Sequence, residues 1–237
     1  MPPSHRLELV NESPLAGQMV VYLEDPETND CLPLVWQSRD CGPGRSVRLE
    51  WNEDFGLTCG AAARPGFTFS GGDIQPAGPG VESFSLVRSA SGYSLKPAAP
   101  AASPGAGDPE YVPEEIAAGF VLSLKPGQQR QSLADLVRDQ PPVPPARPGR
   151  FQVLVEPGVS DLAVALCLEG RPALLRPAKP GLSFPARPRY GLVFGSFEEG
   201  LVLDLNQVVL TTTIDFPGGS LKAVFRRDCL WEITPGG

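Results

Sequence analysis

The side chains in this sequence best suited to contact a ligand are Trp36, Trp51 and Asp54. A solvent-facing indole ring can stack on the apolar face of a sugar, and a neighbouring carboxylate can accept hydrogen bonds from its hydroxyl groups. Both tryptophans, like Trp231, fall inside strand-like segments, where one face of a sheet is buried, so core packing is the favoured interpretation for each. The three residues are therefore weak candidates for a ligand-contact site.

The residue inventory removes most other catalytic chemistry. His5 is the only histidine, and we expect it to lie in a frayed terminus. No serine or cysteine nucleophile is therefore predicted to have a histidine base, and no histidine-based metal site is predicted. The sequence has neither a G-x-x-x-x-G-K-[ST] phosphate loop nor a G-x-G-x-x-G turn after a strand. We therefore expect no nucleotide cofactor.

Paired carboxylates are the one enzymatic class that the composition leaves open, because 27 residues are acidic. A sandwich glycosidase needs two or three acids at alternate positions of one strand. Glu50, Glu53 and Asp54 straddle a predicted turn, and Glu198–Glu199 lies in another, so ordinary solvated carboxylates are favoured. The acidic residues at 24–30 offer oxygen ligands for calcium without a known loop spacing. The sequence predicts no catalytic residue, no metal site and no cofactor.

The five cysteines argue against a disulfide framework or a zinc knuckle, because their number is odd and none form a C-x-x-C pair. Cys59 and Cys167 lie in apolar segments and are predicted to be buried as small hydrophobic residues. Cys31 and Cys41 lie nearer to turns, where they could be exposed or bridged. Their redox state stays open at this point.

Charge and hydropathy narrow the partners and the location. The formal net charge is −7 and no basic stripe is present, so a nucleic acid partner is not expected. No run approaches the roughly 18 apolar residues that a membrane span needs. Residues 1–6 lack the apolar segment of a secretion signal. We expect a cytoplasmic protein with no membrane span, and a protein partner or a small sugar as its ligand.

Short β-branched and aromatic segments bounded by Gly, Pro or Asp predict strands through most of the chain. Residues 47–51 alternate between apolar and charged side chains, which predicts a strand with one buried face. Residues 162–168 contain no polar side chain, so this strand is predicted to be covered on both faces. Turn residues recur at short, regular spacing, which favours an all-β fold of antiparallel sandwiches.

The second half of the sequence resembles the first. Residues 54–60 (DFGLTCG) align with residues 189–195 (RYGLVFG), with an aromatic residue, Gly, Leu and Gly at the same places. Each half also opens with a strand, a turn and a strand, and closes with a hairpin. The sequence therefore predicts two tandem β-sandwich-like repeats related by internal duplication.

A proline-rich segment separates the two halves. Residues 97–149 hold 11 of the 28 prolines, and the run at 141–145 cannot join a sheet interior. We predict sandwich repeat 1 at residues 1–96, a linker rich in Pro, Ala and Gly at 97–149 with one short helix near 132–139, and sandwich repeat 2 at 150–237.

Turn and strand residues in both halves form a recognisable set of segments. They are residues 9–13, Gly17, residues 20–22, residues 25–26, Trp36, residues 43–47 and Trp51 in the first half, and Tyr190, residues 194–195, residues 200–205 and residues 214–217 in the second. Together these segments resemble the bacterial rhizosphere-induced protein RhiA family. The resemblance implies a bacterial protein without an established catalytic activity. It transfers no functional residues.

The sequence favours a non-catalytic β-sandwich protein that binds a partner or self-assembles, because exposed sheet edges suit protein contacts. A lectin-like carbohydrate-binding module is the first alternative, and it predicts an outward pair of aromatic residues beside Asp or Asn. A carboxylate-dependent, glycosidase-type enzyme is the second alternative, and it predicts paired acids in a cleft.

Overall fold

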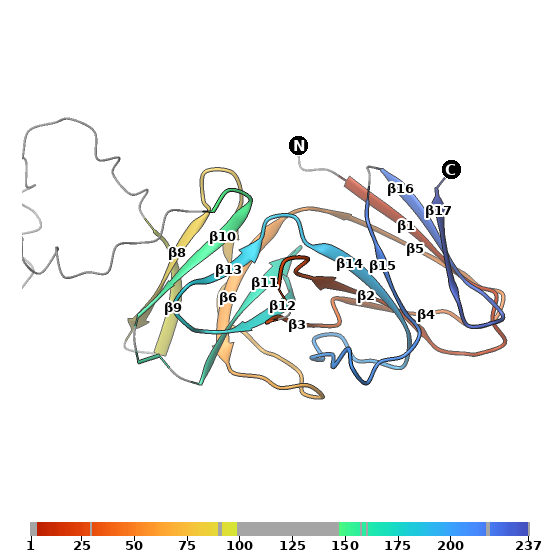
Figure 1. Ribbon diagram of the computed structural model, residues 1–237, viewed down its shortest axis with the longest axis horizontal. Coiled ribbons are helices and arrows are strands. Elements are labelled where there is room, and N and C mark those ends of the chain that lie inside the picture. The colour runs from red at the N-terminus through yellow and green to blue at the C-terminus, as the bar shows by residue number, and fades with distance from the viewer. Residues whose placement is uncertain are drawn as a thin grey trace, which may run out of the picture. The chain divides into compact units, whose positions relative to one another are not determined.

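The computed structural model describes residues 4–28, 30–89, 92–98, 147–156, 158–159, 161–216 and 219–236. Within these ranges the chain forms 17 β-strands in four sheets, joined by turns and bridges (Figure 1). The predicted all-β fold is therefore confirmed. The helix predicted near 132–139 lies outside the described residues.

Two four-stranded sheets form what we call the first sandwich. One sheet contains β1 (Ser4–Asn11), β5 (Ser46–Asn52), β16 (Ser220–Phe225) and β17 (Trp231–Pro235). The other contains β2 (Gln18–Glu24), β4 (Gln37–Asp40), β14 (Arg189–Gly195) and β15 (Thr211–Ile214). Their strand orders are β17–β16–β1–β5 and β15–β14–β2–β4. The rings of Phe194 and Phe225 stack between the two sheets, with centroids 4.4 Å apart.

The remaining two sheets form the second sandwich. One contains β8 (Ser83–Ser89), β9 (Gly92–Pro97), β10 (Arg150–Val155) and β13 (Leu182–Pro185). The other contains β3 (Leu32–Pro33), β6 (Phe55–Ala61), β7 (Gln75–Ala77), β11 (Leu162–Leu168) and β12 (Arg171–Pro177). The orders are β13–β10–β8–β9 and β3–β12–β11–β6–β7. Phe55 and Phe151 meet between these sheets, with ring centroids 6.0 Å apart.

Strand β5 has the two-faced pattern that the sequence predicts. Leu49 and Trp51 are buried, whereas Arg48 and Glu50 are exposed. Leu49 and Trp51 belong to a hydrophobic cluster that extends through the interiors of both sandwiches. Burial of one face of each strand is the main source of stability in this architecture.

Strand β11 is covered on both faces, as its uninterrupted apolar sequence predicts. Val164 and Leu166 point into the main hydrophobic cluster. Ala163 and Ala165 point the other way, into a second cluster that contains Val202. The loop segment that contains Val202 therefore covers the outer face of this sheet.

The strand pairing crosses the boundary predicted between the repeats. Strands of residues 4–97 and strands of residues 150–235 occur together in all four sheets. The described residues on both sides of the proline-rich segment form one compact unit. Each sandwich therefore takes strands from both of the predicted stretches, 1–96 and 150–237. Hydropathy and turn chemistry specify which segments are strands, not which partner a strand pairs with.

Two equivalent glycines explain why the aligned segments share the aromatic-Gly-Leu pattern. A Cβ atom at Gly191 of β14 would overlap the ring of Tyr22, and one at Gly56 of β6 would overlap the side chain of Ile74. At both places a neighbouring side chain covers the strand backbone closely. Only glycine leaves room for that approach.

Candidate functional site

The two predicted tryptophans lie inside the protein. Trp36 and Trp51 are each 1% exposed. Trp36 Nε1 donates a hydrogen bond to the carbonyl oxygen of Leu168 at 2.9 Å, and Trp51 Nε1 donates to the hydroxyl of Tyr190 at 3.2 Å. The two indoles pack edge to face, with centroids 5.4 Å apart. Neither ring forms the outward platform that sugar stacking needs.

Asp54, the third predicted residue, is exposed in the connection between β5 and β6. Its carbonyl oxygen accepts a hydrogen bond from the Glu169 amide at 2.9 Å. The structure therefore does not bring Trp36, Trp51 and Asp54 to one surface. Trp231 is half-buried, and its Nε1 donates to the carbonyl oxygen of Leu210 at 2.7 Å.

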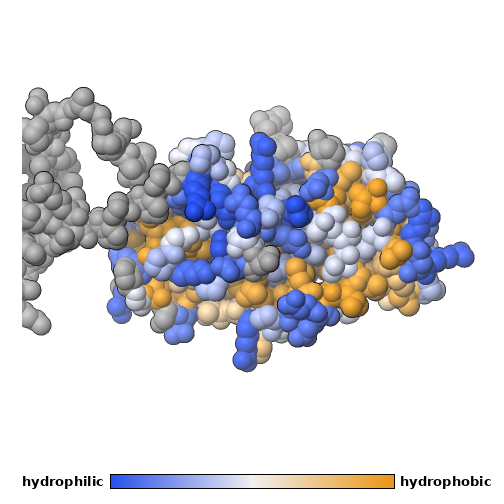
Figure 2. All heavy atoms as spheres, in the orientation of Figure 1, coloured by the Kyte–Doolittle hydropathy of each residue, from blue (hydrophilic) through white to orange (hydrophobic). Residues whose placement is uncertain are grey.

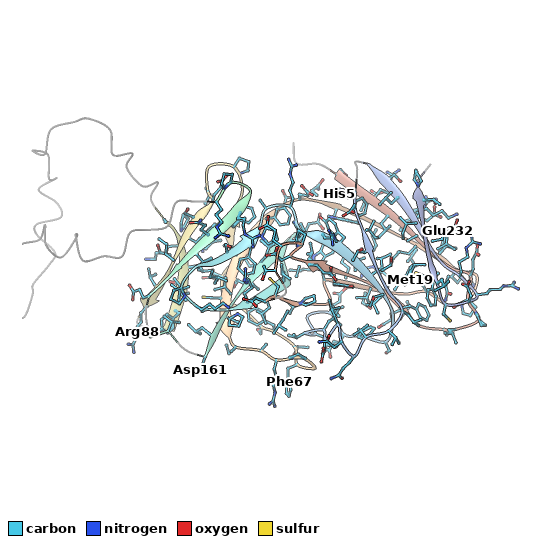
Figure 3. The ribbon with its side chains drawn as sticks, viewed as in Figure 1. His5, Met19, Phe67, Arg88, Asp161 and Glu232 are labelled. Atoms are coloured by element: carbon cyan, nitrogen blue, oxygen red, sulfur yellow. The ribbon has the colours of Figure 1, made fainter. Side chains whose placement is uncertain are left out.

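The expectation that His5 is frayed was wrong. His5 lies in β1 (Figure 3), is only 5% exposed, and its Nε2 is 2.9 Å from Glu53 Oε1. Its ring packs against Phe216 and Trp51, with centroids at 4.9 and 5.4 Å. Among the described residues, its Nδ1 has no hydrogen-bond partner. This packing makes His5 part of the hydrophobic interior of the first sandwich.

The acidic segment at 24–30 meets basic side chains from the second sandwich. Both carboxylate oxygens of Asp25 accept from the guanidinium group of Arg150, which also donates to Glu27 at 2.9 Å. Arg176 approaches Asp25 at 3.9 Å. The side chain of Asp25 is fully buried and that of Arg150 is 6% exposed. This arrangement is a buried ion pair rather than a cation-binding loop.

This packing also shifts the pKa values of neighbouring ionisable groups. Burial raises the pKa of the Cys31 thiol to about 12, so this thiol is protonated and unreactive at neutral pH. A hydrogen bond from Lys179 lowers the pKa of the Asp30 carboxyl. Cys31 and Cys41 are both free thiols. Among the described residues, no group of three or more His, Cys, Asp or Glu side chains is placed to hold a metal ion.

A groove at one end of the first sandwich is the best candidate site. It has a volume of about 1210 Å³. The turns that follow β1, β4 and β16 form it, and Figure 1 shows them together at one end of the sandwich. The lining residues are Glu12, Ser13, Pro14, Pro43, Gly44, Arg226, Arg227 and Asp228.

The side chain of Asn11 organises two of these turns. Asn11 is 0% exposed. Its Nδ2 donates to the carbonyl oxygens of Leu15 at 2.8 Å and Cys41 at 2.7 Å. Its Oδ1 accepts from the amide of Ser13 at 3.0 Å and from the Ser13 hydroxyl at 2.7 Å. Every polar atom of the side chain is thus used to hold the turns.

Backbone hydrogen bonds complete the frame. The Gly44 amide donates to the carbonyl oxygen of Asn11 at 2.7 Å, and Gly44 has a φ of 67°, which glycine adopts without strain. The Glu12 amide donates to the carbonyl oxygen of Phe225 at 2.8 Å. This bond ties the β16–β17 turn to the other two. The floor of the groove is therefore fixed before any ligand arrives.

The rim of the groove combines charge with exposed apolar side chains. Arg226 pairs with Glu12 at 3.5 Å and also with Glu232. Leu15 directly follows the lining residue Pro14 in the chain, and Leu230 follows Asp228 by two positions; they are 43% and 64% exposed. Figure 2 shows hydrophilic residues at this end of the sandwich with hydrophobic residues beside them. This mixture suits binding of a surface or a peptide and provides no nucleophile with a base.

Sequence reasoning missed this site because its residues are ordinary turn formers. Asn-x-Ser and Pro-Gly mark tight turns, and Arg227-Asp228 marks a hairpin end. The signal that could have identified the site is the distribution of the family resemblance, since residues 9–13 and 43–47 both contribute to it and meet at Asn11.

The described residues include no helix that is long and apolar enough to span a bilayer. Comparisons of the chain with protein-family models, curated proteins and solved structures found no match.

Proposed function

We propose that this protein is a non-catalytic β-sandwich module that binds a protein partner, or a second copy of itself, in the groove at the loop end of the first sandwich. The observation that carries the proposal is the pre-formed frame around Asn11, whose buried amide fixes two of the three turns. Rigid turns on a sheet scaffold bind with a small loss of conformational entropy.

The side chains around the groove favour a protein over a small ligand. Arginine is enriched in protein interfaces because its guanidinium group packs and donates several hydrogen bonds at once. Arg226 and Arg227 line the groove, and Leu15 and Leu230 add apolar area next to it. The partner surface therefore carries carboxylates next to small apolar residues.

The two alternative functions stay proposals with less support. Sugar binding needs outward aromatic rings, whereas Trp36 and Trp51 are buried. A carboxylate enzyme needs acids with free oxygens in a cleft, whereas Glu199 pairs with Arg39 and Arg171 at the surface. Neither arrangement favours these classes over partner binding.

On this proposal the chain is a bacterial, cytoplasmic member of the RhiA-like family whose halves arose by internal duplication. The family resemblance supports it, because the segments at 9–13 and 43–47 that carry the resemblance also build the groove. Equivalent strand orders in the two sandwiches support the duplication.

The proposal is tested by crosslinking from inside the groove. A photoreactive benzoylphenylalanine replaces Arg227, and the same residue replaces Arg88 on β8 of the second sandwich as the matched exposed control (Figure 3). We expect a discrete crosslinked adduct, identified by mass spectrometry, at position 227 only. With the purified partner, Arg227→Glu is expected to weaken binding by about tenfold. No adduct, or the same adducts at both positions, would contradict the proposal.

A further inference from the structure

The two sandwiches have the same strand order when the strands of repeat 1 and repeat 2 are matched by their positions along the sequence. The order β17–β16–β1–β5 in the first sandwich corresponds to β9–β8–β10–β13 in the second. The order β15–β14–β2–β4 corresponds to β7–β6–β11–β12. In the sheet that contains β1 and in the sheet that contains β10, the two middle strands are parallel: β1 pairs with β16, and β10 pairs with β8. The match therefore includes strand direction as well as order.

The register of pairing is also the same. In the first sandwich Leu192 pairs with Val21, and in the second the aligned residue Leu57 pairs with Leu166. Two positions away on the same face, Tyr190 pairs with Leu23 and Phe55 pairs with Leu168. A one-residue slip would turn every side chain to the opposite face, so agreement in register is a strict criterion.

Each sheet is built from two strand pairs that meet along a central seam between the repeats, and the five-stranded sheet also carries β3 of repeat 1 beside β12 of repeat 2. Within repeat 1 the pairs are β1–β5, β2–β4, β6–β7 and β8–β9. Within repeat 2 they are β10–β13, β11–β12, β14–β15 and β16–β17. The seams are β1–β16, β2–β14, β6–β11 and β8–β10. Every seam joins one repeat to the other.

Apart from the short strand β3, which belongs to the second sandwich but falls between β2 and β4 of the first along the chain, the chain crosses between sandwiches once in each repeat. Repeat 1 leaves the first sandwich after β5 and enters the second at β6, through residues 53–54. Repeat 2 makes the reverse crossing between β13 and β14, through residues 186–188. Each repeat therefore gives strands to both sandwiches, as two subunits do in a strand-exchanged dimer.

A repeat without its partner would retain only two-stranded pairs. An isolated pair of strands is marginally stable in water, because it cannot bury its apolar face. Leu7 and Leu9 of β1 are 0% exposed, and so is Phe225 of β16 on the other side of that seam. Separation of the repeats would expose both faces.

Buried polar contacts between the repeats, at the junction of the two sandwiches, select the correct partner. Trp36 Nε1 of repeat 1 donates to the carbonyl oxygen of Leu168 in repeat 2. The carboxylate of Asp25 in repeat 1 pairs with Arg150 in repeat 2, and both side chains are buried. Each group would be left buried without a partner if the repeats paired in another register.

We infer that the protein is an internal dimer: its two repeats are obligate folding partners, and repeat 2 of a second copy of this chain can replace the chain's own repeat 2. The surface that binds the second copy is the set of four central seams. The partner is identified by the matching register and the buried polar contacts that the chain already makes with itself. This inference is independent of the groove proposed above.

The first part of the inference is tested on the intact protein carrying a specific protease site inserted between Ala98 and Arg147. We expect the two fragments to stay together after cleavage at the mass of the uncut chain, and to separate only in denaturant. Each purified fragment should lack a cooperative unfolding transition, and the equimolar mixture should regain the transition of the cleaved protein. Two folded fragments that separate on cleavage without denaturant would overturn the inference.

The exchange with a second copy is tested with two differently tagged, uncut chains. The two are unfolded together and refolded at low and at high protein concentration. We expect tags to co-purify only after refolding at high concentration, in a dimer whose circular dichroism matches that of the monomer. Mixing of chains that are already folded is the control and should give no mixed species. Absence of mixed-tag dimers at every concentration would overturn this part.

Discussion

Asn11 Nδ2 lies 2.7 Å from the carbonyl oxygen of Cys41, and so a single amide joins the turn after β1 to the turn after β4. The groove of the first sandwich depends on this link. Replacement Asn11→Ala leaves the buried Cys41 carbonyl oxygen unsatisfied and removes the part-buried hydrogen bond to Leu15, and we expect a loss of about 3 kcal/mol in the free energy of unfolding. Urea denaturation measures it.

A second substitution separates hydrogen bonding from volume. Asn11→Asp keeps the size and the acceptor for Ser13 but puts an oxygen against two carbonyl oxygens, so a loss of similar size is expected. Asn206→Ala, in an exposed turn, is the control and should change stability by less than about 0.5 kcal/mol. If Asn11→Ala behaved like Asn206→Ala, the role assigned to Asn11 would be incorrect.

The buried pair of Asp25 and Arg150 predicts strong coupling. Asp25→Leu alone leaves the buried Arg150 with the exposed Glu27 as its acidic partner, and Arg150→Met alone leaves the buried Asp25 with Arg176 at 3.9 Å, so each single variant is expected to lose about 3 kcal/mol. The double variant should lose less than either single variant. The exposed pair Arg6–Glu50 is the matched control, with an expected coupling below about 1 kcal/mol. Additive losses at Asp25 and Arg150 in the double-mutant cycle would refute the coupling.

Gly191→Ala is expected to destabilise the protein by about 1–3 kcal/mol, because the added Cβ overlaps the ring of Tyr22. Gly78→Ala is the control, since a Cβ there meets no atom within 4 Å. Tyr22→Leu removes the overlapping atoms, so part of the loss should disappear when Gly191→Ala is made in that background. Thermal unfolding of the four variants gives the comparison. An undiminished loss in the Tyr22→Leu background would mean that the overlap is not the cause.

The buried thiols predict a fall in stability at alkaline pH. Burial raises the pKa of Cys167 from 9.0 to about 12, and that of Cys31 to about 12. The unfolded chain releases these protons first as the pH rises. The contribution is therefore fully present below about pH 9 and is lost progressively as the pH rises towards 12, at about 1.4 kcal/mol per pH unit for each thiol.

Unfolding free energies measured between pH 7 and 11 test this sign. Cys167→Ala should lower the stability at pH 7 but flatten its decline above pH 9. Chemical labelling of the Cys167 thiol should be slow in the folded protein and fast in urea, since Cys167 is 0% exposed. A steeper alkaline decline in Cys167→Ala would contradict the assignment.

Local patterns in the sequence were enough to predict most of the strands and their buried faces, although residues 34–36, predicted as a strand, lie between β3 and β4. The alignment of residues 54–60 with 189–195 matches Leu57 with Leu192. In the structure both residues pair with a strand of the other repeat, Leu57 with Leu166 and Leu192 with Val21. The apolar run at 162–168 is buried on both faces as predicted. These features follow from side-chain periodicity, which acts within a single strand.

Long-range features could not be predicted in the same way. Trp36 and Trp51 are interior residues whose indole groups bond to Leu168 and Tyr190, more than a hundred positions along the chain. His5 is buried because the aromatic side chains of Trp51 and Phe216, which are distant in the sequence, cover it. A single sequence does not record such contacts. The groove could not be predicted because it is lined by ordinary turn residues, and it forms only where three turns meet.

The hydrophobic cluster that the two sandwiches share has a thermodynamic consequence. Two sandwiches built from separate stretches of chain commonly melt one after the other, whereas here one hydrophobic cluster extends through the interiors of both sandwiches, so that opening either one exposes the interior of the other. Differential scanning calorimetry should record a single endotherm whose calorimetric and van't Hoff enthalpies agree. Damage at one end of this molecule is therefore felt at the opposite end.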